Sequence, residues 1–200
     1  NMLEVGCAIG SFLKVAHEEG YNVTGVDLSL QACEIASKEV LGAKVFQGTL
    51  EAVSLTPESF DVIFMSDLVE HVPEPKRFWE EIVKLLKNNG IIYLVTPDPR
   101  HWSCVLTGSS WVHFKEEHLI FFPRNTVNWV CHKFGLNFIE FSHIVKYTNL
   151  AYFSAQTKQF GPKALAFGIS MLSSFLPRKW GETLFPLPLG EARYILRKAP

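Results

Sequence analysis

The sequence predicts an α/β domain in which a parallel sheet is flanked by helices. Short apolar runs rich in Val, Ile and Phe alternate with segments of helical spacing through the first half of the chain. The chain has 200 residues, of which 48% are hydrophobic, with 19 basic and 20 acidic side chains. This profile is that of one folded domain, and it excludes a disordered chain, a collagen-like repeat and a coiled coil.

Five strands and three helices are expected in the first half of the chain. We place the strands at 1–5, 21–26, 43–46, 59–65 and 91–95, and the helices at 11–19, 29–41 and 74–87. Each helix stops at glycine, which takes the left-handed conformation that ends helices: Gly20, Gly42 and the Asn-Asn-Gly run 88–90. Ser29 is a good N-cap, and Pro75 costs little in a first helical turn. Gly25 interrupts the apolar pattern of the second strand.

The second half is less regular, and we expect it to add two insertions to a single domain spanning residues 1–200. Residues 98–122 are aromatic, rich in histidine and irregular, which predicts a lid or pocket wall outside the core. Residues 150–189 are apolar and broken by prolines, and we place the second insertion there. A helix over 125–134 that stops at Gly135, and strands over 138–145 and 192–196, complete the domain.

The charge balance and the apolar runs exclude several classes of protein. With a net charge of −1 and no strip of interleaved basic and aromatic residues, the chain is not expected to bind nucleic acid. The longest apolar run, 164–176, is shorter than the roughly 20 residues that a membrane-spanning helix needs. The four cysteines form no CxxC pair and the chain shows no secretory signal, so we expect a cytoplasmic protein.

A glycine-rich loop follows the first strand and opens the first helix. Gly6, Ala8 and Gly10 are small enough to let backbone amides approach a ligand at the helix N-terminus. Their spacing is one residue tighter than the GxGxxG fingerprint of dinucleotide-binding proteins. Simple tight packing is an equal alternative for such a turn. Ala8 is expected to fit without a positive φ.

A carboxylate is expected beside this loop. Asp27 ends the second strand, so it lies at the carboxyl edge of the sheet next to the first loop. There it can accept hydrogen bonds from the two vicinal hydroxyls of a ribose. The alternative is a charge that stabilises the N-terminus of the helix after Ser29. Leu28 offers an apolar face for a base.

Four segments together resemble the class I S-adenosylmethionine-dependent methyltransferases, and within them the ubiquinone-biosynthesis O-methyltransferase group. The segments are LEVGCAIGSF, VTGVDLS, SFDVIFMSDLVEHVPEP and NNGIIYLVTPD, and the resemblance is strong from Met2 to Pro97. It implies a Rossmann-like, doubly wound sheet of seven mostly parallel strands with an antiparallel last strand, in three αβα layers. It also implies methyl transfer from S-adenosylmethionine to an oxygen, nitrogen or carbon atom of a small or lipid-like acceptor.

The resemblance further implies a set of cofactor-binding residues. Glu4 would face the methionine amino group or the loop amides, and Gly6, Cys7, Ala8 and Gly10 would wrap the methionine and ribose. Asp27, with Leu28 beside it, would hold the ribose hydroxyls. The adenine would be bordered by Thr49, Leu50 and Glu51. The methionine would be met by Met65, Ser66 and Asp67. Ala8 and Thr49 depart from the family, which commonly has glycine and an acidic residue there. The N-terminal helix that closes over the cofactor in relatives is also expected upstream of this sequence.

Two histidines are candidates for catalysis. A sulfonium methyl is already activated, so the enzyme mainly aligns the acceptor and excludes water. A base is needed only where the acceptor starts protonated, and His71 and His118 could serve. The alternative for His71 is a hydrogen bond within its own turn. No metal is expected, because the spacing of His101, Cys104, His113 and His118 matches no common zinc pattern.

The acceptor side and the function class leave several interpretations open. Five aromatic residues in the lid predict a pocket for a flat or apolar acceptor, although core packing explains most of them equally well. They are Trp102, Trp111, Phe114, Phe121 and Phe122. Residues 160–187 could lie on a membrane surface, cap the site or form a dimer face. A catalytically silent nucleotide-binding module is the alternative function. An NAD(P)-dependent oxidoreductase is disfavoured by the glycine spacing.

Overall fold

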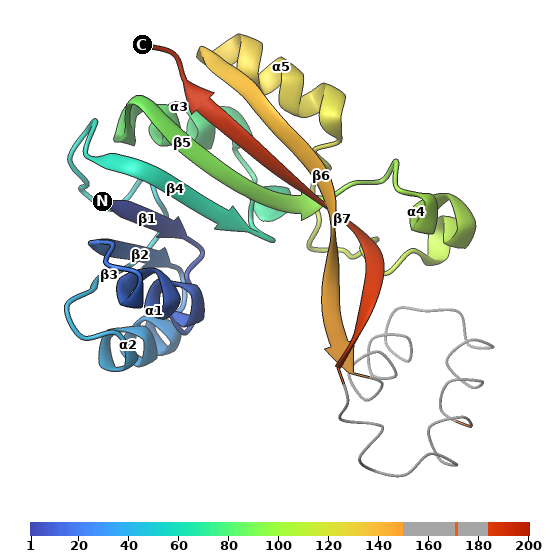
Figure 1. Ribbon diagram of the computed structural model, residues 1–200, viewed down its shortest axis with the longest axis horizontal. Coiled ribbons are helices and arrows are strands. Elements are labelled where there is room, and N and C mark those ends of the chain that lie inside the picture. The colour runs from blue at the N-terminus through green and yellow to red at the C-terminus, as the bar shows by residue number, and fades with distance from the viewer. Residues whose placement is uncertain (150–170, 172–183) are drawn as a thin grey trace.

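A seven-stranded mixed sheet forms the centre of the computed structural model, which describes residues 1–149, 171 and 184–200 (Figure 1). The strands are β1 (Met2–Val5), β2 (Val23–Asp27), β3 (Lys44–Gln47), β4 (Phe60–Ser66), β5 (Leu86–Pro97), β6 (Leu136–Asn149) and β7 (Leu184–Lys198). Their order is β3-β2-β1-β4-β5-β7-β6. β1 to β5 pair parallel with one another, and β7 pairs antiparallel with both β5 and β6. The predicted sheet with an antiparallel last strand is therefore confirmed.

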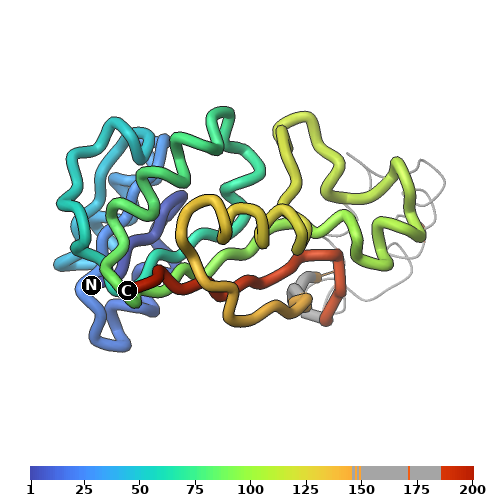
Figure 2. Tube along the Cα trace, turned by 90° about the horizontal axis from the view of Figure 1, so that it is seen from above, coloured from blue at the N-terminus to red at the C-terminus, as the bar shows by residue number. Residues whose placement is uncertain are grey.

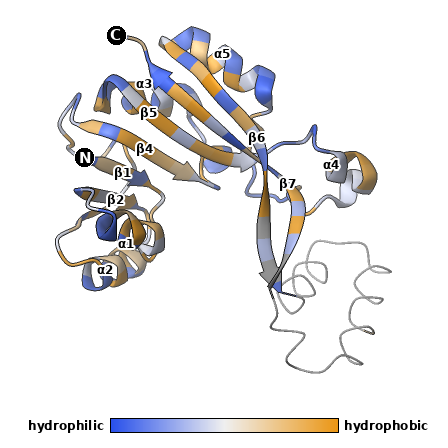
Figure 3. Cartoon of the chain, in the orientation of Figure 1, coloured by the Kyte–Doolittle hydropathy of each residue, from blue (hydrophilic) through white to orange (hydrophobic). Residues whose placement is uncertain are grey.

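Helices cover both faces of the sheet, as Figures 1 and 2 show. They are α1 (Ser11–Glu18), α2 (Leu30–Glu39), α3 (Pro75–Leu85), α4 (Trp102–Thr107) and α5 (Arg124–Phe134), with short 3-10 turns η1 (Val69–His71) and η2 (Gly108–Ser110). The larger core cluster joins the sheet to α3 and α5 through residues such as Ile63, Ile82 and Val127. A second cluster packs Leu13 and Ala16 of α1 against the other face. Hydrophobic colour follows the central strands (Figure 3), as expected for strands covered on both sides.

The local signals in the sequence set most helix ends. The Ser29 hydroxyl accepts a hydrogen bond from the Ala32 amide at 3.2 Å, so Ser29 is the N-cap that was predicted for α2. Pro75 occupies the first turn of α3, and Gly135 ends α5 with a φ of 66°. Ser29 acts through its hydroxyl on its own helix, and Pro75 and Gly135 act through their own backbone geometry, which explains why the sequence alone located them.

The start of β5 differs from the prediction. The run 88–90 was expected to be a turn before a strand at 91–95, but β5 begins at Leu86, directly after α3. Phe60 pairs with Leu86 and Val62 pairs with Ile91, so the residues between Leu86 and Ile91 form a bulge within the strand. The Asn-Asn-Gly run does not pair with β4, and Asn89 has a φ of 62°, so the run keeps a left-handed residue within the bulge.

The last two strands are longer than predicted. β6 spans Leu136–Asn149 instead of 138–145, and β7 spans Leu184–Lys198 instead of 192–196. Residues 184–189, assigned to an insertion, therefore belong to β7, although Pro186 and Pro188 lie among them. Antiparallel pairing continues as far as Asn149 and Leu184 because a proline loses only its own amide from the ladder. The rest of the predicted insertion at 150–189 lies outside the described residues, apart from Met171.

Residues 98–122 form part of the core as well as a surface segment. The prediction of a wholly irregular lid outside the core was wrong, because α4 and η2 lie here and Trp111 and Phe122 are fully buried. Trp102 and Phe114 are exposed by 58% and 43%. Core packing therefore accounts for part of the aromatic content of this segment, as the alternative interpretation had it.

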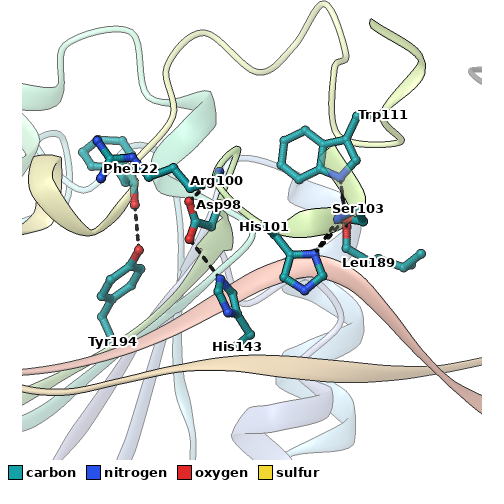
Figure 4. A network of polar contacts seen from close by, with 9 residues as sticks. All are labelled: Asp98, Arg100, His101, Ser103, Trp111, Phe122, His143, Leu189 and Tyr194. Carbon is teal, nitrogen blue, oxygen red and sulfur yellow. Dashed lines mark hydrogen bonds and ion pairs between the residues drawn. The ribbon is translucent and has the colours of Figure 1, made fainter. Parts of the chain in front are cut away.

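A network of polar contacts fastens this segment to β6 and β7 (Figure 4). The buried Asp98 carboxylate lies 3.0 Å from His143 Nε2 on β6. The Ser103 hydroxyl and Trp111 Nε1 each donate to the Leu189 carbonyl of β7 at 3.0 Å. All these partners are distant in sequence, so they hold α4 against the sheet only once β6 and β7 have paired.

No helix within the described residues is long and apolar enough to cross a membrane. The apolar run 164–176 falls outside them except for Met171, so its prediction stays untested.

Candidate functional site beside the glycine loop

The loop between β1 and α1 is built from residues in the left-handed conformation. Gly6, Ala8 and Gly10 have φ values of 77°, 45° and 80°. The expectation that Ala8 avoids a positive φ was wrong, and its cost is about 1–2 kcal/mol for a residue with a Cβ. This conformation directs the Ala8 amide at the Asp27 carboxylate, to which it donates at 2.8 Å. The hydrogen bond to a charged acceptor offsets the strain.

Close packing beneath the loop leaves no room for side chains at two glycines. A Cβ at Gly25 would lie 2.7 Å from both Cys7 Sγ and Leu13 Cδ1, and one at Gly10 would lie 2.9 Å from the Ala36 Cβ. The Cys7 side chain is buried in this packing and points away from solvent. Burial raises the pKa of its thiol to about 12, so the thiol stays neutral. Cys7 therefore supports the loop from below.

Asp27 lies beside the loop, as the sequence predicted. Its Oδ2 accepts from the Ala8 amide at 2.8 Å and its Oδ1 accepts from the Ser29 amide at 2.9 Å. The second contact is the helix N-terminal role that the sequence left open, and the contact with ribose hydroxyls stays a prediction. A carboxylate offers roughly four acceptor positions, and two are used by the backbone. The others are available to a ligand, since Asp27 lines a cavity.

This cavity has a volume of about 490 Å³, within the range of small-molecule sites. Five of the residues predicted to bind cofactor line it besides Asp27: Gly6, Leu28, Thr49, Leu50 and Glu51. Leu28 is 68% exposed, so its apolar face is open to a base. The far wall comes from the segment 71–74 with Arg77 and Phe78 of α3, and of these residues sequence reasoning assigned only His71 to the site. The rest of the EHVPEP motif was the signal that could have located the residues that follow it.

The residues predicted to meet the methionine do not line this cavity. The Met65 side chain is fully buried in the core, because strand alternation places it on the same face as Ile63. Its predicted contact with the methionine stays a prediction. Ser66 and Asp67 follow at the end of β4, where the Ser66 hydroxyl donates to Asp67 Oδ2 at 3.2 Å.

Glu4 lies behind the loop and is only 6% exposed. Its Oε2 is buried without a hydrogen-bond partner, and the Leu13 backbone in the first turn of α1 is its hydrogen-bond donor. Burial raises the pKa of Glu4 to about 8; the Leu13 hydrogen bond opposes this shift and the Asp27 charge adds to it. Leu13 belongs to α1 and not to the loop, so both predicted contacts of Glu4 stay predictions.

The two candidate histidines lie together although 47 positions separate them. Their rings meet edge to face with centroids 4.7 Å apart, and His71 Nδ1 lies 2.9 Å from the Glu117 carbonyl oxygen. His71 also lines the cavity. Burial lowers the pKa of His118, and the neighbouring His71 and Lys115 lower it further, so its neutral form dominates at neutral pH.

Glu70 completes a group that the sequence did not predict. One ligand atom each from Glu70, His71 and His118 lies within 4.8 Å of the others, a carboxylate and two imidazoles that suit a divalent cation. Glu70 is fully buried, and its Oε2 accepts from the Thr96 hydroxyl at 3.0 Å. In the described part of the chain, the four residues considered from spacing form no such group. The prediction that the protein holds no metal stays untested.

Comparisons with known proteins agree with this architecture. A family model described as a methyltransferase domain matches residues 3–94, from β1 into β5. The ubiquinone biosynthesis O-methyltransferase of Idiomarina loihiensis is 35% identical over 100 residues, covering 48% of this chain and 41% of that protein. The enzyme of the same name from Sodalis glossinidius is 28% identical over 119 residues, covering 56% and 48%. The chain thus spans about half the length of the curated relatives it matches.

Solved structures extend the likeness to the whole fold. A Bacillus subtilis protein has a TM-score of 0.67 at 17% identity, covering 100% of this chain and 92% of that one. An S-adenosylmethionine-dependent methyltransferase from Mesorhizobium loti has a TM-score of 0.64 at 16% identity, covering 99% and 90%. Residues 3–94 therefore resemble a methyltransferase domain in sequence, and the chain shares the fold of these solved structures.

Proposed function

We propose that this chain transfers a methyl group from S-adenosylmethionine to an oxygen, nitrogen or carbon atom of a small or lipid-like acceptor, leaving S-adenosylhomocysteine. The observation that carries the proposal is the Asp27 carboxylate held against the glycine loop at an open cavity. The names of the curated relatives support oxygen as the first acceptor atom to test.

The residues around the cavity fit this cofactor. Asp27 keeps acceptor positions for ribose hydroxyls after its two backbone contacts. Glycine is needed at position 6. A Cβ there would lie 3.1 Å from Leu68 Cδ1, and a residue with a Cβ would be strained at a φ of 77°. Leu28 and Leu50 supply apolar surface for an adenine. The bound cofactor would supply a methyl group activated by its sulfonium.

The protein's part in the transfer is alignment and proton handling. An acceptor placed in line with the methyl carbon, with water excluded, reacts without covalent help from the enzyme. His71, at the cavity, and His118, against it, are the proposed bases for an acceptor that starts protonated. His118 suits this role because its burial favours the neutral imidazole.

The location and the partners of the protein also remain proposals. All four cysteines are buried free thiols, which supports a reducing cytoplasm. Residues 160–187 are proposed to contact a membrane surface or a second copy, and most of them lie outside the described residues. No nucleic-acid partner is proposed, because the net charge is −1.

Calorimetry with S-adenosylhomocysteine tests the function. Asp27→Ala should weaken binding by about 2–3 kcal/mol, roughly 30- to 150-fold in Kd, because hydrogen bonds to a charged group are lost. Ser29→Ala is the matched control: it removes the α2 cap next door and should lower stability with Kd unchanged. Equal Kd values for Asp27→Ala and the unmodified chain would refute the assignment. If the chain binds NADH and not S-adenosylhomocysteine, an oxidoreductase is favoured. If it binds S-adenosylhomocysteine but methylates no acceptor, a catalytically silent binding module is favoured.

A further inference from the structure

A buried carboxylate lies beside the two candidate bases, and the proposed function gives it no role. Glu70 is fully buried, and one of its oxygens lies within 4.8 Å of a ring nitrogen of His71 and of His118. Its Oε2 accepts a hydrogen bond from the hydroxyl of Thr96, another fully buried residue, at 3.0 Å. A buried carboxylate is normally hydrogen-bonded or paired with a positive charge, and an imidazole beside it can carry that charge.

Hydrogen bonding determines which nitrogen of His71 is basic. His71 Nδ1 lies 2.9 Å from the Glu117 carbonyl oxygen. A carbonyl oxygen only accepts, so Nδ1 carries the proton and donates it, which leaves the lone pair of the neutral ring on Nε2. His71 lines the cavity, and His118 is not among the described residues that do. His71 Nε2 is therefore the basic atom that an acceptor in the cavity can reach.

Backbone contacts hold the His71 ring in this arrangement. The Leu119 amide donates to the Glu70 carbonyl oxygen at 2.8 Å, so the segment 117–119 contacts the η1 turn both through this bond and through the Glu117 carbonyl. His118 lies within that segment and meets the His71 ring edge to face, with centroids 4.7 Å apart. The ring is thus fixed on two sides before any ligand binds.

Other charged groups also face this region. They are Lys115 and Glu117 beside His118, and Asp27, Glu51, Glu74 and Arg77 around the cavity. Glu74 and Arg77 lie 3.8 Å apart, and their side chains are 71% and 65% exposed, so solvent weakens the effect of both charges. Glu70 differs from all of these groups in being fully buried, where its charge is not screened by solvent.

We propose that His71 is the base of the methyl transfer and that Glu70 is its positioning residue. The inference rests on the proposed function. His71 Nε2 takes the proton of an acceptor hydroxyl, the acceptor oxygen gains the methyl group, and the electron pair of the broken carbon–sulfur bond stays on sulfur. The imidazole ring then carries a positive charge, which the adjacent Glu70 carboxylate stabilises while holding the ring in place.

Nitrogen-15 NMR of the histidine side chains tests both assignments without an acceptor. The neutral His71 ring should carry its proton on Nδ1. Glu70→Gln keeps the shape of the side chain but removes the charge, so the ratio of protonated to neutral His71 at pH 6.5 should fall about tenfold. Glu116→Gln, which alters an exposed acid of the neighbouring segment, is the matched control and should leave this ratio unchanged.

Two results would overturn the inference: a neutral His71 ring protonated on Nε2, or an unchanged ratio in Glu70→Gln. The position of the ring proton is read from the unmodified chain, so it can refute the inference even where Glu70→Gln fails to fold. Zinc or magnesium ions should not shift the His71 and His118 signals of the metal-free chain. A stoichiometric shift would show that these residues hold a cation, and the role given to Glu70 would be wrong.

Turnover of two probe acceptors separates this inference from the function on which it rests. With catechol, a protonated phenol at pH 7, His71→Gln should lower kcat by about 10²- to 10⁴-fold and Glu70→Gln by about tenfold, with KM unchanged. With thiophenol, which is ionised at pH 8 and needs no base, both variants should match the unmodified chain. Equal losses on both probes would mean that Glu70 has only a structural role. If the unmodified chain neither binds S-adenosylhomocysteine nor methylates a probe, the proposed function fails, and the NMR result stands by itself.

Discussion

Gly25→Ala tests the close packing on which the glycine loop depends. The added Cβ would lie 2.7 Å from Cys7 Sγ and from Leu13 Cδ1, and 3.2 Å from the Cys7 Cβ. Overpacking of this kind costs about 1–3 kcal/mol. Replacing a strand glycine by alanine otherwise gains about 0.5–1 kcal/mol through the unfolded chain. The expected net loss is therefore about 1–2 kcal/mol in the free energy of unfolding.

Urea unfolding measures this loss, and calorimetry with S-adenosylhomocysteine shows whether the loop moves. Because Cys7 belongs to the loop, its displacement should weaken binding as well as stability. Adding Cys7→Ala removes the sulfur that clashes, so the double variant should lose less stability than the sum of the two single changes. Gly20→Ala is the control: a Cβ there meets nothing within 4 Å, and its φ of 89° costs stability without touching the loop. A Gly25→Ala protein as stable as the unmodified chain, with unchanged binding, would refute the packing argument.

Two further predictions concern buried polar groups. Ser103→Ala removes the hydroxyl that donates to the Leu189 carbonyl and accepts from Trp111 Nε1, and should cost about 1–2 kcal/mol in urea unfolding monitored by tryptophan fluorescence. An unchanged unfolding midpoint would mean that α4 is held by other contacts. Burial raises the folded pKa of Glu4 from 4.5 to about 8, so the folded chain retains a proton that the unfolded chain loses, and stability should fall as pH rises between these values. The slope approaches about 1.4 kcal/mol per pH unit for one proton, and a Glu4→Gln chain with the same slope as the unmodified one would contradict the assignment.

The sequence predicted those features that depend on short stretches of chain. Ser29 and Gly135 act on their own helix ends, and the apolar strands of the first half could be recognised because both of their faces are covered. Asp27 was placed correctly because parallel strands end at one edge of the sheet. Each of these features could be inferred from a short stretch of sequence or from a general rule of sheet topology.

Other features depend on partners that are distant in sequence. The hairpin of β6 and β7 continues through Pro186 because pairing with Tyr147 and its neighbours outweighs the local signal of a proline. The conformation of Ala8 follows from the Asp27 carboxylate, 19 positions away, that its amide contacts. Met65 was assigned to the site by the family resemblance, whereas strand alternation, which is a local pattern, places its side chain in the core. No local pattern indicates the pairing of Pro186 or the conformation of Ala8.

The two halves of the site are stabilised in different ways, and this has a consequence for engineering the protein. The cofactor side is formed by β1, the loop and β2, which pack around Cys7 and Leu13 in one core cluster and contribute to the larger cluster as well. The opposite wall of the cavity comes from residues 71–74 and α3. Residues 98–122, the predicted acceptor side, are attached to the late strands by polar contacts such as the one between Asp98 and His143. Changes more than about 7–10 Å apart without shared partners usually have additive effects. Substitutions in the polar network should therefore alter acceptor selection and local stability while the Kd for S-adenosylhomocysteine stays constant, and a change in that Kd would show that the two sides are coupled.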